Sequence, residues 1–169
     1  LWIPQHEWEY SLDFKAEDYI LREDVIELVF EGLDTYADVW MNGVKILHAD
    51  NMFRTYSYDV KDIIKETNNI KIKFYPFDKE RDSLIETYPL RFPEKYAVMR
   101  KAAYQNGWDW APRYMNMGVW QPVYLKAWTR STICSASVIT NEIHDDKADL
   151  FFEACINADV EHDITLQLF

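Results

Sequence analysis

The sequence is poor in the residues that build phosphate and metal sites. It contains four glycines, two cysteines and four histidines, namely Gly32, Gly43, Gly107, Gly118, Cys134, Cys155, His6, His48, His144 and His162. The glycines are too dispersed for a phosphate-cradling loop, and the cysteines and histidines lack zinc-ligand spacing. A GxSxG sequence for a nucleophilic serine is absent. We therefore expect no metal site and no cofactor, and the histidines as surface or partly buried residues. The two cysteines, each in a candidate strand, are expected to be separate buried thiols, and a facing pair stays open as the alternative.

Positive charge is scarce as well. The lysines and arginines number 18 against 29 aspartates and glutamates, which gives a formal net charge of -11. Nucleic acid and anionic membranes would repel such a chain, so neither is expected as a partner. No apolar run is long enough to span a bilayer, and no charged-apolar-small leader opens the chain. The chain begins at Leu1 rather than at a methionine, which indicates a processed, excised or shortened chain.

An Asn-x-Ser/Thr acceptor is also missing. Its absence weakly disfavours a glycosylated eukaryotic secretory protein. The cysteines leave the redox compartment open. A bacterial periplasm or cytoplasm is favoured for the source protein, and a lysosome stays open as an alternative.

The hydrophobic pattern predicts strands and turns with little helix. Hydrophobic residues make up 49% of the 169 residues, enough for the core of one domain or of one domain plus part of another. Segments 8–14, 70–74 and 123–127 alternate apolar and polar residues, as half-buried strands do, and the denser run 25–30 is typical of a strand covered on both faces. Residues 35–47 are expected to form a hairpin around Asn42-Gly43, a pair favoured where a tight turn needs positive φ.

Two segments interrupt this pattern. Asp59 is a plausible N-cap for a short helical turn through Asp62. Residues 76–106 contain three prolines and lack clear strand periodicity, and loops of that length are usually functional or disordered. The sequence therefore predicts a long loop between the strands at 70–74 and 123–127.

The character of the chain changes near Arg130. Three short candidate strands follow at 133–139, 147–156 and 163–169, separated by acidic turns. Three short strands are few for an independent sandwich. We therefore interpret residues 1–130 as one β-sandwich and residues 131–169 as the opening strands of a second, incomplete one.

The long loop ends in a motif suited to carbohydrate. Residues 104–113 read Tyr-Gln-Asn-Gly-Trp-Asp-Trp-Ala-Pro-Arg and place Asp109 between two indoles. A pyranose packs its C–H face on an aromatic ring and donates hydroxyl hydrogen bonds to a fixed carboxylate. The alternative is that Trp108 and Trp110 are ordinary core residues with Asp109 facing water. Gly107 favours the functional interpretation because it can supply the backbone conformation that leads into Trp108.

Five motifs in order resemble the N-terminal sugar-binding domain of β-mannosidases in glycoside hydrolase family two. They are Leu28-Val-Phe-Glu-Gly-Leu-Asp34-Thr-Tyr-Ala-Asp-Val-Trp-Met-Asn-Gly43, Asp50-Asn-Met-Phe-Arg54-Thr-Tyr-Ser-Tyr-Asp-Val60, Arg100-Lys-Ala-Ala-Tyr, Gly107-Trp-Asp-Trp-Ala-Pro-Arg113 and Gly118-Val-Trp-Gln-Pro-Val123. The resemblance covers residues 7–128 strongly. It implies an all-β chain, with a jelly-roll (galactose-binding-like) β-sandwich followed by the first strands of an immunoglobulin-like β-sandwich.

The resemblance also implies which domain carries out catalysis and which residues of this chain bind the sugar. The catalytic glutamates of the family lie in a (β/α)₈ barrel that has no counterpart here, so this chain is expected to contain no catalytic residue. Trp108 and Asp109 would bind the terminal β-mannose at the barrel mouth. Trp110 would anchor the loop in the sandwich, and Arg113 would have a structural role. Asn51, Phe53 and Arg54 would form a loop.

The chain departs from the family pattern at three positions. Ala111 stands where the family usually has Gly, Asn106 where it usually has Phe, and Gln121 where a basic residue is common. A side chain at position 111 puts the local backbone in doubt, because a Cβ disfavours positive φ.

Alternatives to a β-mannosidase stay open at this point. The same aromatic residues could serve a free-standing carbohydrate-binding module, and the fold is shared with β-galactosidases and β-glucuronidases. The residues encoded after Phe169 would decide between an enzyme and a module. Residues 131–169 should expose unpaired strand edges, so we expect them to associate with another copy or another piece of the same protein, or to be poorly ordered.

Overall fold

The computed structural model describes residues 2–87, 95–158, 161 and 165. The predicted strand at 163–169 lies almost wholly outside these residues, as do His162, Pro89 and Pro93. Half of the chain forms strands, and every pairing between the named strands is antiparallel. The prediction of an all-β sandwich is confirmed.

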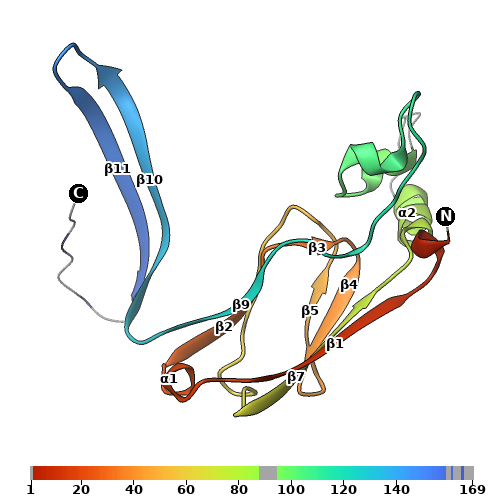
Figure 1. Cartoon of the computed structure of the whole chain (residues 1–169), viewed down its shortest axis with the longest axis horizontal. Helices are drawn as coiled ribbons and strands as arrows, with labels where there is room; N and C mark the ends of the chain where they lie inside the picture. The colour runs from red at the N-terminus through yellow and green to blue at the C-terminus, as the bar shows by residue number, and fades with distance from the viewer. Residues whose placement is uncertain (1, 88–94, 159–160, 162–164, 166–169) are drawn as a thin grey trace.

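Two sheets form the sandwich (Figure 1). The first has the order β1-β7-β4-β5, with β1 at Trp8–Lys15, β7 at Thr67–Phe74, β4 at Ala37–Met41 and β5 at Val44–Ala49. The second has the order β6-β2-β9, with β6 at Tyr56–Asp59, β2 at Val25–Phe30 and β9 at Val123–Trp128. A short pair joins β3 (Leu33–Asp34) to β8 (Gly118–Val119).

The core lies between the two sheets. Strand β7 alternates buried and partly buried residues along its length, so that Ile70, Ile72 and Phe74 point inward. Strand β2 supplies Leu28 and Phe30 to the same cluster. It also buries Val29 on its other face, as expected for a strand covered on both sides.

The predicted hairpin at Asn42-Gly43 is confirmed. Asn42 has φ 52° and Gly43 has φ 84°, the positive values that a two-residue hairpin turn requires. The Asn42 side chain also donates from Nδ2 to the Ile63 carbonyl at 2.8 Å and to Asn68 Oδ1 at 2.9 Å. The turn therefore fixes the register of β4 and β5 and ties their end to the neighbouring loop.

The inward face of strand β1 is more exposed than its half-buried pattern predicts. Tyr10 and Leu12 lie opposite Ile72 and Ile70 on β7, so their side chains share the inward face. They are nevertheless 47% and 61% exposed. They line an open apolar cavity of about 220 Å³ together with Val119 and Val123. Alternation thus gave the correct strand and face, but nothing in the described part of the chain covers this end of the sandwich.

The segment predicted as an irregular loop contains a helix, so that prediction is wrong over part of its length. Helix α2 spans Phe77–Thr87, directly after Pro76 and with two acidic residues in its first turn. Only Phe77 of this helix is buried, so its apolar periodicity was too weak to indicate a helix. The other helical segments are short: η1 (Ile3–Gln5), α1 (Asp18–Leu21), η2 (Lys95–Val98) and η3 (Ala103–Asn106). No helix among the described residues is long and apolar enough to cross a membrane.

The turn after β6 is shorter than a helix. Asp59 Oδ1 accepts a hydrogen bond from the Lys61 amide at 2.9 Å, so the predicted capping side chain is present. The Val60 carbonyl then accepts from the amides of Ile63 and Ile64 at 3.0 and 2.8 Å. The chain therefore makes a single capped turn and continues into β7.

Strands β10 (Ser131–Ile143) and β11 (Ala148–Ala158) form a long two-stranded hairpin that extends away from the sandwich (Figure 1). Most of its side chains are exposed. Cys134 and Cys155 are exposed and unbonded, so the expectation of buried thiols is wrong. The division of the chain at residue 130 and the immunoglobulin-like character of the second part stay predictions.

Candidate functional site

Residues 108–111 form a tight turn. The Trp108 amide donates to the Ala111 carbonyl at 3.2 Å, and the Ala111 amide donates back to the Trp108 carbonyl at 3.2 Å. This reciprocal pairing makes an isolated antiparallel bridge, with Asp109 and Trp110 at the tip. Both tip residues are exposed, so the carboxylate of Asp109 lies at the surface.

Neither tryptophan belongs to the core. Trp108 is 63% exposed and Trp110 is 81% exposed, which excludes the interpretation of both as ordinary core residues. The prediction that Trp110 anchors the loop in the sandwich is also wrong. The turn places Trp110 at its exposed tip instead. Two exposed indoles therefore flank one exposed carboxylate.

Gly107 gives the backbone its entry into this turn. Its φ is 94°, a value that side chains disfavour, and a Cβ added there would lie 3.4 Å from the backbone of Arg113. In the described part of the chain the only non-glycine residues with positive φ are Asn42 and Arg130. Ala111 therefore lies outside the strained region, and its presence where the family usually has Gly does not strain the turn.

An open cavity of about 760 Å³ adjoins the turn. Trp108 and Asp109 line it together with Met99, Lys101, Asn106 and other residues of segment 96–113. Asn106 Oδ1 is buried, and it has no hydrogen-bond partner among the described residues. The cavity thus combines an aromatic wall and a carboxylate.

Arg113 braces the far side of the turn. Its guanidinium lies 4.3 Å from the Tyr96 ring centroid and 4.0 Å from Asp78 Oδ1. The contact with Asp78 on α2 fits the structural role expected of Arg113. Arg113 therefore links the turn to α2 and to η2.

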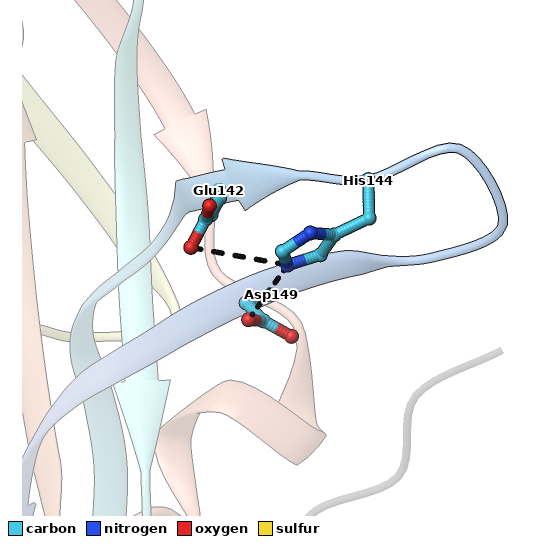
Figure 2. A group of neighbouring side chains, drawn as sticks. All are labelled: Glu142, His144 and Asp149. Carbon is cyan, nitrogen blue, oxygen red and sulfur yellow. Dashed lines mark hydrogen bonds and ion pairs between the residues drawn. The ribbon is translucent and has the colours of Figure 1, made fainter.

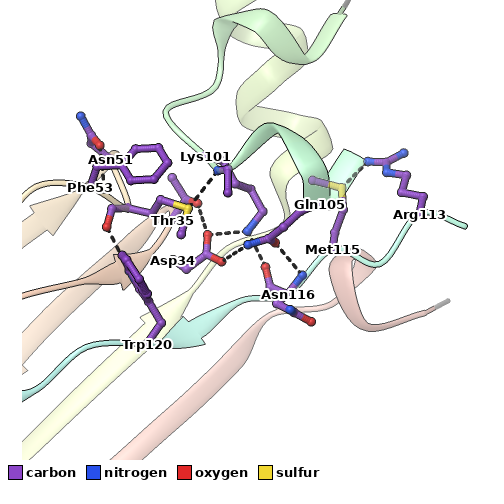
Figure 3. A network of polar contacts seen from close by, with 12 residues as sticks. Asp34, Thr35, Asn51, Phe53, Lys101, Gln105, Arg113, Met115, Asn116 and Trp120 are labelled. Carbon is purple, nitrogen blue, oxygen red and sulfur yellow. Dashed lines mark hydrogen bonds and ion pairs between the residues drawn. The ribbon is translucent and has the colours of Figure 1, made fainter. Parts of the chain in front are cut away.

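A buried ion pair holds the base of this segment against the sandwich (Figure 3). The ammonium group of Lys101 contacts Asp34 Oδ1 and donates to the Asn116 carbonyl at 2.6 Å. The Lys101 and Asp34 side chains are 0% and 4% exposed. The Lys101 ammonium also lies 4.4 Å from the Phe77 ring centroid, so α2 closes over the pair.

Other groups complete the hydrogen bonding of the pair. Gln105 donates from Nε2 to Asp34 Oδ2 at 3.1 Å and accepts from the Asn116 amide at 3.0 Å. The Thr35 hydroxyl donates to Asp34 Oδ1. Burial lowers the pKa of Lys101, and the opposing charge of Asp34 counteracts that shift. A buried pair satisfied in this way fixes η3 and the segment after the turn relative to β3.

A second set of contacts joins the preceding loop to the same segment. Asn51 Oδ1 accepts from the Phe53 amide at 2.9 Å, and the Met52 amide donates to the Arg100 carbonyl at 2.9 Å. Trp120 donates from its indole nitrogen to the Met52 carbonyl at 2.9 Å. The prediction that Asn51 and its neighbours form a loop is confirmed, since the Asn51 side chain and the backbone of residues 52 and 53 make the contacts that shape it.

Sequence reasoning missed the roles of Asp34, Lys101 and Gln105. Asp34 and Lys101 lie within quoted motifs, but 67 positions separate them along the chain. A lysine and an aspartate are also usually exposed. Only the paired burial of both charges identifies them as the support of the site.

The family comparison fits this arrangement. Residues 1–121 match the model of the glycosyl hydrolase 2 galactose-binding domain-like family. The chain belongs to this family. The match covers β1 to β8 together with the turn at Trp108 and Asp109.

Several proteins that the chain resembles are β-mannosidases. The chain is 32% identical to β-mannosidase of Mus musculus over 139 residues, which is 75% of this chain and 16% of that enzyme. It is 33% identical to β-mannosidase B of Thermothelomyces thermophilus over 132 residues, or 74% of this chain and 15% of that enzyme. A crystal structure of β-D-mannosidase from Dictyoglomus thermophilum superposes with a TM-score of 0.84 at 30% identity, covering 93% of this chain and 20% of that protein. The chain thus spans about a sixth of the length of the curated relatives that it matches.

Proposed function

We propose that this chain is the non-catalytic N-terminal part of a retaining β-mannosidase. Its segment 104–113 lines the subsite for the terminal mannose of a β-mannoside. The observation that carries the proposal is the exposed turn of Trp108 and Asp109, which adjoins a cavity and rests on the buried Lys101–Asp34 pair. The similarity to β-mannosidases supports the choice of sugar.

The two residues would act on different parts of the sugar. Trp108 offers an exposed indole face to the C–H groups of the pyranose. Asp109 accepts charge-assisted hydrogen bonds from hydroxyls remote from the reacting carbon. Remote contacts of this kind orient the ring and support its distortion toward the transition state.

The chemical step belongs to another part of the enzyme. A retaining glycosidase needs two carboxyl groups about 5 to 5.5 Å apart across the scissile bond. By family resemblance, those groups are glutamates of the barrel domain. The loop of this chain would therefore supply one wall of the pocket and the barrel its floor.

The direct test is hydrolysis of aryl glycosides by the full-length enzyme from the source gene. We expect release of the aryl group from the β-mannoside in preference to the β-galactoside and the β-glucuronide. The 169-residue chain alone should release none. Preference for either of the other glycosides would overturn the assignment of mannose.

A calorimetric titration separates the enzyme part from a free-standing module. The isolated chain should bind mannose and β-manno-oligosaccharides very weakly or not at all, because it lacks most of the pocket. Sub-millimolar binding that is lost in Trp108→Ala would favour the module instead.

We further propose that residues 131–169 mediate association. In β10 and β11, Ile139 lies opposite Phe151 and the next pair, Val138 and Phe152, points to the other face. Both faces of the hairpin therefore carry apolar side chains, and Ile139 and Phe151 are 52% and 50% exposed. Such edges and faces pair with another strand when one is available. The partner in the isolated chain would be a second copy.

A further inference from the structure

A cluster of one histidine and two carboxylates, all possible metal ligands, lies at the tip of the β10–β11 hairpin (Figure 2). His144 Nε2 is 3.3 Å from Asp149 Oδ2 and 3.8 Å from Glu142 Oε2. One donor atom from each residue lies within 4.8 Å of the other two. We propose that Glu142, His144 and Asp149 bind a divalent transition-metal ion of the Zn²⁺ class. This site is separate from the sugar-binding turn and does not depend on the proposed function.

The donor types and their spacing fit such an ion. Zinc takes imidazole nitrogen and carboxylate oxygen at roughly 2.1 Å, and three protein ligands leave a position for water. Two ligands of a tetrahedral ion with that bond length lie about 3.4 Å apart. The distances from His144 Nε2 to the two carboxylates bracket this value. The exposed carboxylates can close the third edge by a change of rotamer.

The strand register supplies an independent reason for a cation here. Glu142 and Asp149 are direct cross-strand partners. Two like charges in that relation destabilise an antiparallel pair. His144 follows directly after β10, and its Nε2 reaches both carboxylates. A metal ion held by all three would remove the repulsion.

The backbone around the cluster is shaped to present it. A register shift lies between Thr140 and Glu142, and bulges of this kind re-aim the side chains that follow. The His144 amide donates to the Lys147 carbonyl at 2.8 Å, which closes the turn and fixes the backbone of the histidine. The same turn carries Asp145 and Asp146, whose charges add to the attraction for a cation.

The simpler interpretation is a solvated histidine paired with two carboxylates. His48 provides the matched case, because its Nδ1 lies 2.7 Å from Asp38 Oδ1 while Lys45 occupies the other oxygen of that carboxylate. His48 thus contacts one carboxylate, and no second carboxylate joins it to form a metal-binding group among the described residues. The two histidines differ in the number of carboxylates beside the ring, which is one for His48 and two for His144.

Zinc titration by calorimetry tests the proposal on the 169-residue chain without a histidine tag. Cys134 and Cys155 are replaced by serine in every sample, since exposed thiols bind zinc themselves. We expect one saturable site that disappears in His144→Ala and weakens at least about tenfold in Asp149→Asn. His48→Ala should bind zinc as the parent does.

Amide resonances locate the site and check folding. Zinc should shift the signals of residues 142–149 in the parent. If His144→Ala perturbs the hairpin, Asp149→Asn still tests the site, because asparagine has nearly the same shape as aspartate. Absence of saturable binding in the parent would overturn the proposal. Unchanged binding in the folded Asp149→Asn and His144→Ala variants would do the same, as would an equal loss in His48→Ala.

Discussion

Lys101 and Asp34 form an ion pair that is buried on both sides. Lys101 lies six residues before Gly107, and Asp34 ends the short strand β3. The pair therefore connects the sandwich to the segment that carries the exposed turn. We infer that the position of Trp108 and Asp109 depends on this contact.

Replacing Lys101 by Met should destabilise the chain strongly. The substitution leaves the buried carboxylate of Asp34 without its cation, which costs about 3 to 5 kcal/mol in the free energy of unfolding. Lys71→Met is the control, because Lys71 is 45% exposed in its ion pair with Glu9, and we expect a cost below about 1 kcal/mol there. Denaturant unfolding measures both. Equal losses of unfolding free energy in the two variants would show that the buried pair stabilises the chain no more than the exposed pair does.

Stability should fall in alkaline solution because of two tyrosines. Burial raises the pKa of Tyr36 and of Tyr75 to about 12, and Asp38 adds to the shift of Tyr75, whose hydroxyl donates to it. An unfolded tyrosine titrates near pH 10. The stabilisation is therefore complete below pH 10 and is lost as the pH rises toward about 12.

Tyr75→Phe should reduce this alkaline loss. The variant keeps the ring, over which Lys73 lies at 5.3 Å, but has no proton to release. Denaturation midpoints across the alkaline range give the slope for the parent and for the variant. An identical slope in both would contradict the role of Tyr75, and Tyr19→Phe at an exposed position serves as the control.

Asn106→Leu should stabilise the chain. Asn106 Oδ1 is buried without a partner in the described part of the chain, and an unsatisfied acceptor costs about 1 to 3 kcal/mol. Removing it should raise the free energy of unfolding by about 1 kcal/mol, since the new side chain must still fit the site. Asn157→Leu on the exposed face of β11 should change it by less than about 0.5 kcal/mol. A destabilised Asn106 variant would indicate that the amide has a partner after all.

Removing the hairpin should abolish self-association. Light scattering should give a higher mass per particle for the full chain than for a chain ending at Arg130. Burial of apolar surface contributes about 25 cal/mol per Å², enough to oppose the repulsion of a net charge of -11 once several side chains are covered. A strictly monomeric full chain with strongly protected amides in residues 131–158 would show that the hairpin is stable alone.

Local sequence signals predicted much of the sandwich. The Asn42-Gly43 pair fixed a hairpin because its positive φ values admit few residue types. Period-two alternation found β7, and a continuous apolar run found β2. These signals work because each depends on neighbours in the chain or on one buried face.

The site depended on contacts that the sequence does not display. The turn at Trp108 arises from hydrogen bonds between residues three apart, and it leaves Trp110 exposed at its tip rather than anchored in the sandwich as predicted. Helix α2 buries only Phe77, so periodicity gave no indication of it. The Lys101–Asp34 pair exists only once the fold has brought β3 and the long segment together.

The most direct test of the sugar subsite is the kinetics of Asp109→Ala in the full-length enzyme on an aryl β-mannoside. Loss of a charge-assisted hydrogen bond, with sugar hydroxyls left unpaired, should cost about 2 to 3 kcal/mol in transition-state binding, or roughly 30- to 150-fold in kcat/KM. Asp145→Ala, at an exposed turn of the hairpin, should retain the parent value. A folded Asp109→Ala enzyme with parental kcat/KM would contradict the assignment of this turn to the substrate.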